Sequence, residues 1–474
     1  MEKWVLQALK KERKKLHLPL EAKKIGKNYY LYKSTSKWDK QKKKTKKVST
    51  YLGKLTEKGV TPRVRGTRRL RTIYEYGNAK LAFELSAKIL PGLKQFFPFS
   101  WQELIATSIV KLLQQTPLKL VKSRWEKLYL SREIDSSLSP NTLSDKIRLI
   151  GSDWESQKKF FESLIRDSKF LVFDLSSIFS ESEKLPLAEK GHNADHLYIK
   201  QINFALFFSQ DTRKPVMLKP LPGSVRDIKC LKNVLEEFSI ASCVLVIDRG
   251  FASYPMADLL SEKRVKFIMP LRRNFEIIDN NMPLPNSFVY RHRGINWGKK
   301  QVGEQILYMF EDVKLRAEEE SIFISLISEG KREKRKLAYE RRKFGKISIL
   351  TNVNWKQGEK IYTAYKQREE VEQAFDAFKN ELENDKTYLS DADAVRGYFF
   401  ISFLSLYLYY EIQNLLRKNK LNTKMSVNEV LLELSKIYLA YYDNGDKHLT
   451  EVPAKAENLE KAFQLNLFPK TLRS

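Results

Sequence analysis

Cysteine is almost absent from this sequence, and so are long apolar runs. The 474 residues include only two cysteines, Cys230 and Cys243, so disulfide bonds cannot form a framework for the fold, which is typical of proteins in a reducing compartment. The longest apolar run, residues 398–410, is too short to span a bilayer, which takes about 20 residues, and favours a buried helix. The N-terminal residues contain no apolar stretch of signal-peptide length. These features predict a cytoplasmic protein with no membrane partner.

Acidic residues are also scarce relative to basic ones. Lys and Arg total 86 against 57 Asp and Glu, which gives a net charge of +29. Because a surplus of this size repels itself, it predicts a polyanionic partner, most often nucleic acid. An anionic membrane surface and structural RNA are the alternatives. With 42% hydrophobic and 12% aromatic residues, the chain has enough apolar material for a globular fold of several domains.

The basic residues are concentrated at the N-terminus. Residues 1–60 contain 19 Lys or Arg and 5 acids, and two β-like runs, 29–32 and 48–53, flank the Lys-rich residues 40–47. This arrangement predicts a basic N-terminal β-hairpin region over 1–60, with a solvated charge run as the alternative.

Helical patterns follow the basic region. They predict a mainly helical DNA-binding region over 61–167, either a helix-turn-helix or a plain bundle. Ser139 followed by Pro140 is typical of a helix start. The expected helices cover residues 79–95, 101–115, 117–130, 140–150 and 154–167.

The pattern changes to α/β near residue 169. Apolar β-like runs and intervening helices come in the order of three strands, a helix, a strand, a helix and a strand, as in the mixed sheet of ribonuclease H-like enzymes. We therefore expect a ribonuclease H-like catalytic domain over 168–270 and 352–416. Short β-like pieces, including 305–310 and 321–327, predict a β-rich insertion over 271–351 that lies outside this sheet. A helical C-terminal region is expected over 417–474.

Two aspartates each come directly after an apolar β run. Asp174 follows residues 170–173, and Asp248 follows residues 244–247. Since ligands of open α/β sheets bind at the carboxyl ends of strands, and hard cations prefer oxygen ligands, the pair predicts a shared cation site. A turn-forming or helix-capping role is the alternative reading of each aspartate.

Four residues of a predicted helix over 358–384 carry a further pattern. Tyr365, Arg368, Glu372 and Lys379 stand at offsets 0, 3, 7 and 14, which places them within an arc of about 60° on one helix face. An acid flanked by two cations and a phenol suits a metal ligand surrounded by groups that hold DNA phosphates. The alternative is a surface helix with ordinary ion pairs.

Together, Asp174, the segment 248–251 and the Tyr-x2-Arg-x3-Glu-x6-Lys pattern resemble the DDE transposases of insertion sequences, in particular the family named after insertion sequence four. The stretches 191–196, 201–203 and 222–227, and more loosely 51–54, add to the resemblance. It implies a ribonuclease H-like domain with a β-rich insertion and a site with two Mg²⁺ or Mn²⁺ ions. Residue by residue, the catalytic metal ligands would be Asp174, Asp248 and Glu372, and the DNA-binding residues Tyr365, Arg368 and Lys379.

The resemblance also implies partners and a location. The substrates would be double-stranded DNA, both the terminal inverted repeats of an element and its target, bound by a homodimer in the nucleoid of a prokaryotic cell. The reactions would be hydrolysis at the element ends followed by strand transfer. A nuclease of the same fold without strand transfer, and an inactive DNA-binding relative, are the alternatives.

Two further pairs of residues have ordinary explanations. His192 and His196 have the spacing of zinc ligands on a helix, but Gly191 and Asn193 beside them favour a loop. Cys230 and Cys243 are expected to be small core residues and not a redox pair.

Overall fold

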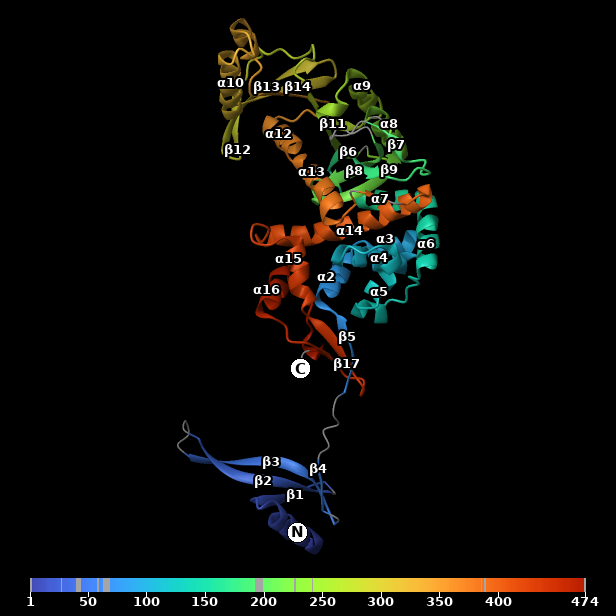
Figure 1. Ribbon diagram of the computed structural model, residues 1–474. Helices are drawn as coiled ribbons and strands as arrows, with labels where there is room; N and C mark the ends of the chain where they lie inside the picture. The colour runs from blue at the N-terminus through green and yellow to red at the C-terminus, as the bar shows by residue number, and fades with distance from the viewer. Residues whose placement is uncertain are drawn as a thin grey trace. The chain divides into compact units, whose positions relative to one another are not determined.

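The computed structural model describes residues 2–26, 28–39, 44–57, 59–62, 69–191, 199–225, 227–240, 242–384, 386–387 and 389–472. The chain forms two compact units, Met1–Thr72 with Ala440–Lys447, and Ile73–Leu439 with His448–Ser474 (Figure 1). Each unit has its own core.

In the first unit, one helix packs on an antiparallel sheet. Helix α1 (Lys3–Leu16) precedes strands β1 (Leu20–Ile25), β2 (Asn28–Asp39), β3 (Lys44–Thr56) and β4 (Gly59–Pro62), which pair in sequence order. Two small apolar clusters join helix and sheet: Val5, Ala8, Tyr29 and Leu55 form one, and Leu9, Leu20 and Leu31 form the other. The antiparallel pairing of β2 with β3 confirms the predicted hairpin. The tip, residues 40–43, lies outside the described residues.

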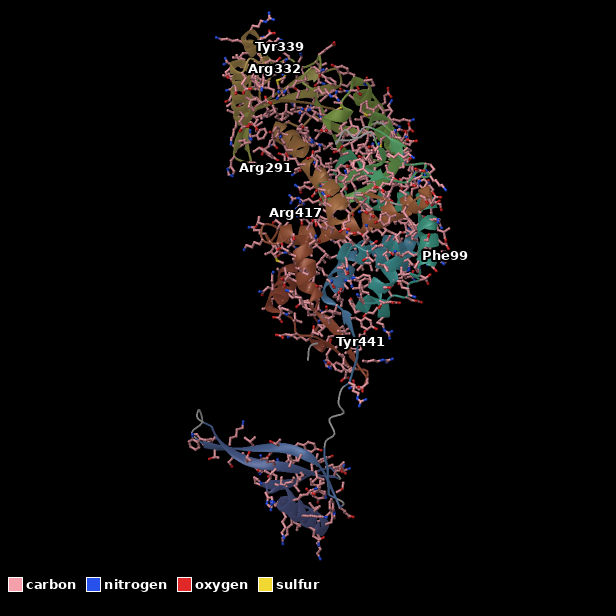
Figure 2. All side chains as sticks on the ribbon, in the orientation of Figure 1. Phe99, Arg291, Arg332, Tyr339, Arg417 and Tyr441 are labelled. Carbon is pink, nitrogen blue, oxygen red and sulfur yellow. The ribbon has the colours of Figure 1, made fainter. Side chains whose placement is uncertain are left out.

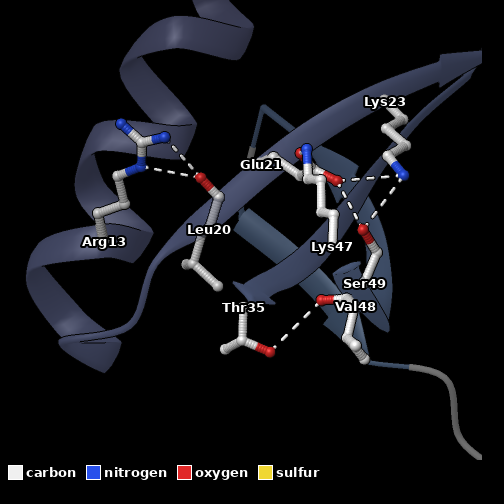
Figure 3. Close-up of polar contacts among 8 residues, drawn as sticks. All are labelled: Arg13, Leu20, Glu21, Lys23, Thr35, Lys47, Val48 and Ser49. Carbon is white, nitrogen blue, oxygen red and sulfur yellow. Dashed lines mark hydrogen bonds and ion pairs between the residues drawn. The ribbon is translucent and has the colours of Figure 1, made fainter. Parts of the chain in front are cut away.

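Polar contacts hold this unit together around its apolar clusters (Figure 3). Arg13 donates from Nε and Nη2 to the carbonyl oxygen of Leu20 at 3.0 and 2.5 Å, which fixes the end of α1 to β1. On the sheet, Glu21 accepts a hydrogen bond from Ser49 at 3.0 Å and pairs with Lys23 and Lys47. These contacts link β1 to β3 across the intervening β2, and they hold Lys23 and Lys47 on the sheet surface.

In the second unit, one sheet of 11 strands runs through the described residues. Its order is β12-β13-β14-β15-β11-β10-β6-β8-β7, with β9 paired to β8 and β16 to β6. Strands β10 and β11 run parallel to β6, and β8 runs antiparallel to β6 and β9. The bounds are β6 (Phe170–Ser180), β7 (Glu189–Lys190), β8 (Lys200–Ser209), β9 (Lys214–Pro222), β10 (Val244–Ile247), β11 (Lys266–Leu271), β12 (Asn286–Tyr290), β13 (Arg293–Val302), β14 (Gln305–Asp312), β15 (Lys346–Thr351) and β16 (Lys386–Thr387).

Helices surround this sheet and continue below it in Figure 1. The predicted capped start at Ser139 is confirmed, since its side chain accepts from the Thr142 N–H. The helices are α2 (Gly77–Ser86), α3 (Leu90–Phe96), α4 (Trp101–Leu113), α5 (Val121–Trp125), α6 (Pro140–Ser152), α7 (Trp154–Ile165), α8 (Asp227–Glu237), α9 (Tyr254–Glu262), α10 (Val313–Ser328), α11 (Leu337–Glu340), α12 (Gly358–Lys366), α13 (Glu369–Asp376), α14 (Ala392–Lys418), α15 (Val427–Ser435) and α16 (Ala454–Phe463). A third sheet has the order β18-β17-β5, from β5 (Leu70–Glu75), β17 (Tyr438–Tyr442) and β18 (Lys447–Leu449).

The apolar helix α14 connects the sheet to the helices. It packs against β9 and also against α4 and α6, and Figure 1 shows it between the two layers. Aromatic side chains of α7 and α14 meet edge to face. The ring centroids of Phe160 and Phe400 are 5.5 Å apart, and those of Phe161 and Phe403 are 4.9 Å apart. The apolar run in the sequence is therefore a core helix, as predicted. Within the part of the chain that the structure describes, no helix has both the length and the apolar content needed to cross a membrane.

Two glycines allow α6 and α14 to approach closely. A Cβ added at Gly151 would stand 1.7 Å from the carbonyl oxygen of Asp393, and one at Gly397 would stand 2.0 Å from that of Ile147. Since real atoms do not approach so closely, only glycine fits at this crossing.

The insertion differs from its prediction. Strand β14 pairs with β15, and β15 pairs with β11, so the strands of residues 271–351 extend the central sheet instead of lying outside it. The expected strand 321–327 is wrong, because these residues belong to α10, where Asp312 caps the helix by accepting from the Leu315 N–H. The consecutive apolar residues Ile322, Phe323 and Ile324 resemble a strand in sequence, but of these three only Phe323 is buried.

Two other expectations need correction. The predicted continuous helix over 358–384 is broken between α12 and α13 and ends in a π-helical turn, η5 (Ala377–Glu381). The C-terminal region contains β17 and β18 beside its helices, so it is not purely helical.

The glycine crossing gives a test of the core. Gly397→Ala should lower the free energy of unfolding by about 1–3 kcal/mol, because the added methyl group forces α6 and α14 apart. Leu149→Ala is the control on α6, since Leu149 is 65% exposed and should change stability by less than about 0.5 kcal/mol. Denaturant unfolding of both variants measures the difference. Equal stabilities would contradict the close crossing.

Candidate active site

The two aspartates lie side by side because of the register of two parallel strands. β6 and β10 pair from Phe170 and Val244 up to Phe173 and Ile247, and Asp174 and Asp248 are the next residues. However, β6 does not end at Asp174 as expected. It continues to Ser180 with β8 as its partner, and Asp174 lies opposite Leu206. The parallel neighbour ends there instead, which opens the sheet beside Asp174.

Helix α13 brings the third carboxylate to the same place. Its apolar residues Val371, Ala374 and Phe375 are buried, and the helix contacts β6 and β8. The Phe375 ring lies 5.5 Å from Phe204 of β8. With this face on the sheet, Glu372 lies close enough to Asp174 for its charge to raise the pKa of that aspartate.

Arg368 is the centre of the cluster. It lies in the break between α12 and α13, and its Nη1 is 3.8 Å from Asp174 Oδ2 and 3.5 Å from Asp248 Oδ1. Its Nη2 is 3.0 Å from Glu372 Oε1. One guanidinium therefore contacts all three predicted carboxylates, and the structure brings four of the six predicted site residues together.

The cluster shifts the pKa of Asp174 strongly. Burial raises this pKa from 3.8 to about 7, and the negative charges of Asp248 and Glu372 raise it as well. The Leu175 N–H, which donates to Asp174 Oδ1 at 2.8 Å, and the Arg368 guanidinium act in the opposite direction. A carboxylate in this position needs a nearby cation in order to stay ionised at neutral pH.

Tyr365 and Lys379 are placed differently from the other four. Tyr365 lies in α12 and is only 8% exposed, and its carbonyl oxygen accepts from the Arg368 N–H at 3.1 Å. Lys379 lies in the π-helical turn η5 and is partly buried. The four signature residues therefore do not share one continuous helix face, because the helix is broken between them.

The donor chemistry suits a divalent metal ion, but the present spacing does not. Among the described residues, no group of three or more His, Cys, Asp or Glu side chains is arranged to hold a metal. The Arg368 guanidinium lies among the three carboxylates instead. Three carboxylates are the oxygen ligands that Mg²⁺ and Mn²⁺ prefer. They fit such an ion if Arg368 moves aside and the carboxylates close in.

A polar pocket beside this cluster could not be inferred from the sequence. It has a volume of about 400 Å³ and is formed by residues that are far apart in the chain, so no local motif marks it. The lining residues are Arg213, Arg291, Lys366, Gln367, Glu369, Glu370, Gln373, Arg417 and Asn422.

Two further residue pairs were candidates in the sequence, and the structure describes one of them. Cys230 and Cys243 are 0% and 1% exposed, which confirms them as core residues. His192 and His196 lie outside the described residues.

Comparison with known proteins agrees with this geometry. Residues 164–408 match the family described as "Transposase DDE domain". The chain belongs to the DDE transposase family. The matched segment contains all three carboxylates and Arg368, so the charge cluster of this DDE transposase lies within its family domain.

No curated protein matches this chain. A solved structure, the piggyBac transposase synaptic complex with hairpin DNA, is similar with a TM-score of 0.41 and 11% sequence identity, over 83% of this chain and 86% of the other.

The raised pKa of Asp174 gives a prediction for the metal-free transposase. Between about pH 4 and pH 7 the folded protein keeps a proton on Asp174 that the unfolded chain has lost, so unfolding releases a proton and becomes easier as pH rises. Asp174→Asn cannot titrate and should therefore gain stability relative to the wild type across this window, by up to about 4 kcal/mol. Denaturant unfolding in EDTA at pH 5 to 8 measures the difference. A difference that is the same at every pH would contradict the raised pKa.

Proposed function

We propose that this protein catalyses DNA transposition, with Asp174, Asp248 and Glu372 as the ligands of two divalent metal ions, Mg²⁺ or Mn²⁺. The observation that supports this most is the convergence of the three carboxylates on Arg368 within a transposase domain. The reaction is cleavage at the ends of a mobile element, followed by transfer of the cut strand into target DNA.

The strand order supports a ribonuclease H-like catalytic domain as part of this proposal. The central strands have the order β9-β8-β6-β10-β11 and are formed along the chain as three strands, a helix, a strand, a helix and a strand. The first aspartate lies on β6 and the second follows β10, at the point where two parallel neighbours separate. Within the transposases, the Tyr365, Arg368, Glu372 and Lys379 spacing favours the family named after insertion sequence four.

Each site residue has a role that follows from its position. When bound, two metal ions activate a water and stabilise the leaving 3′ oxygen of an in-line displacement. Asp174 must lose its proton to act as a ligand. Arg368 leaves the carboxylates and turns its charge toward the scissile phosphate, where Lys379 adds a second cation. Tyr365 is buried, which suits a positioning role and not that of a covalent nucleophile.

The DNA partner is supported by the distribution of charge. Residues 1–60 carry 19 basic and 5 acidic residues, a surplus of 14 out of the net +29. We propose that this region and the helices of 61–167 bind the terminal inverted repeats as duplex DNA, that a homodimer pairs the two ends, and that the protein works in the nucleoid of a prokaryotic cell. Neutralising phosphates with lysines makes such binding strongly dependent on salt.

The proposed reaction is tested with purified protein and duplex DNA that carries both flanks of its gene. With Mg²⁺ or Mn²⁺ we expect strand cleavage and joining of the cut ends to a plasmid. Glu372→Ala should abolish both while DNA binding persists, because one metal ligand is lost. Cleavage without joining would indicate a nuclease of this family. Binding with no cleavage under any metal would indicate an inactive relative.

A second prediction concerns Arg368 and can be tested without measuring cleavage. In metal-free protein, Arg368→Ala leaves three carboxylates without their shared cation, so it should unfold at a lower temperature and be stabilised more by Mg²⁺ than the wild type. End binding should weaken, with a salt slope shallower by about one for a lost phosphate contact. Arg332→Ala, an exposed site in the insertion, is the control. If the two variants respond alike to Mg²⁺ and salt, Arg368 has no special role.

A further inference from the structure

The polar pocket beside the carboxylates has the chemistry of a phosphate site. Its lining contains four cations, Arg213, Arg291, Lys366 and Arg417, against two acids, Glu369 and Glu370. The remaining lining residues are amides, so no apolar residue type lines the pocket. Figure 2 shows Arg291 and Arg417 on the same side of this unit, one from the β12–β13 turn and the other near the end of α14.

The pocket adjoins the proposed catalytic cluster through a single short segment. On α13, Glu369, Glu370 and Gln373 line the pocket, and Glu372 belongs to the carboxylate cluster together with Arg368, which directly precedes this helix. Successive helical residues differ by about 100° in direction. A strand that crosses this segment therefore meets both groups.

Arg213 lies in the β8–β9 turn, and hydrogen bonds from this turn and to it fix its backbone. Gln210 donates to the carbonyl oxygen of Ala364 in α12 at 2.7 Å. From α14, Asn414 donates to the carbonyl oxygens of Thr212 and Arg213 at 2.9 and 3.2 Å. The turn is thus tied to both helices that border the pocket, and Arg213 is presented from a fixed backbone.

Two of the arginines occupy backbone positions that favour glycine. Arg213 has φ of 51° and Arg291 has φ of 48°, a left-handed region that costs a residue with a side chain about 1 kcal/mol or more. The guanidinium groups are therefore present despite a conformational cost.

The arginines are only loosely paired with the acids. Arg213 Nε and Arg417 Nη1 lie 3.7 and 3.6 Å from the same oxygen of Glu370, too far for good hydrogen bonds. Arg417 Nη1 is buried and has no hydrogen-bond acceptor among the described residues. Arg291 Nη1 stands 3.3 Å from Glu369. Arg417 Nη2 donates to Gln373 Oε1 at 3.3 Å. The exposed guanidinium groups of Arg213 and Arg291 keep N–H donors for a further anion.

We propose that this arginine pocket binds a backbone phosphate of the DNA duplex that is cut at the carboxylates. The inference rests on the proposed function in that DNA is the substrate. Glu370 acts as the internal counter-ion that pairs with both Arg213 and Arg417 until the phosphate arrives. The pocket thereby fixes the position of the duplex relative to the cut, with charge-assisted bidentate contacts as arginine makes to phosphates.

The test measures DNA binding without metal, so it does not depend on catalysis. Arg213→Gln and Arg291→Gln, both at well-exposed side chains of 49% and 65%, should each weaken duplex binding about threefold to tenfold. Each should also make the dependence of log affinity on log salt shallower by about one. Arg332→Gln makes the same change in net charge outside the pocket and should have a clearly smaller effect. An equal effect of all three variants would overturn the proposal.

Glu370→Gln provides a prediction of opposite sign. Removing the counter-ion releases Arg213 and Arg417 for phosphate, so duplex affinity should rise, and the rise should be lost when Arg213→Gln is added. A fall in affinity with normal folding, checked by circular dichroism, would contradict the pocket. If pocket variants change binding but no metal supports cleavage, the pocket stands and the proposed function fails. If cleavage occurs and binding is unchanged in the variants, the pocket fails alone.

Discussion

The site depends on one constraint, the mutual repulsion of three carboxylates that meet where β10 ends beside β6. Asp174 and Asp248 are adjacent because β6 and β10 are parallel and in register, and Glu372 is added from a helix packed on the same sheet. Burial and two negative neighbours raise the pKa of Asp174 to about 7. The Arg368 guanidinium lowers this pKa, so the cost of the buried charge would be larger without it. The break between α12 and α13 sets Arg368 where its guanidinium supplies this positive charge.

Helix α14 gives the site its rigid support. It is packed on both sides, by β9 and by α4 and α6, and its aromatic contacts with α7 join the helical layer to the sheet. Its last turns carry Asn414 and Arg417, which reach the β8–β9 turn and the arginine pocket. A side chain at the end of a buried helix is more precisely placed than one on a loop. The core and the proposed phosphate site therefore depend on the same element.

Much of the site could be predicted from local patterns. Asp174 and Asp248 each follow an apolar run, and Arg368 and Glu372 are four residues apart, which brings them together on a helix. The prediction was wrong where the structure of a segment depends on the strand or helix that it packs against. No local signal shows that β6 continues past Asp174 on β8, or that Ile322 and Ile324 belong to an exposed helix. Helix α1 was missed although Val5, Ala8, Leu9 and Glu12 share one buried face, since the density of lysines hid the pattern. The arginine pocket depends on distant segments and leaves no trace in the sequence.

The way the insertion joins the sheet has an evolutionary consequence. The chain leaves β11 at Leu271, extends the sheet with β12, β13 and β14, and returns at Lys346 on β15, which is the direct neighbour of β11. The entry and exit points are thus adjacent, as at the base of a hairpin, and closing a longer or shorter segment between them costs little extra free energy. Related proteins can lengthen, shorten or exchange this segment without moving Asp174 or Asp248. The segment can therefore diverge while the carboxylate cluster stays unchanged.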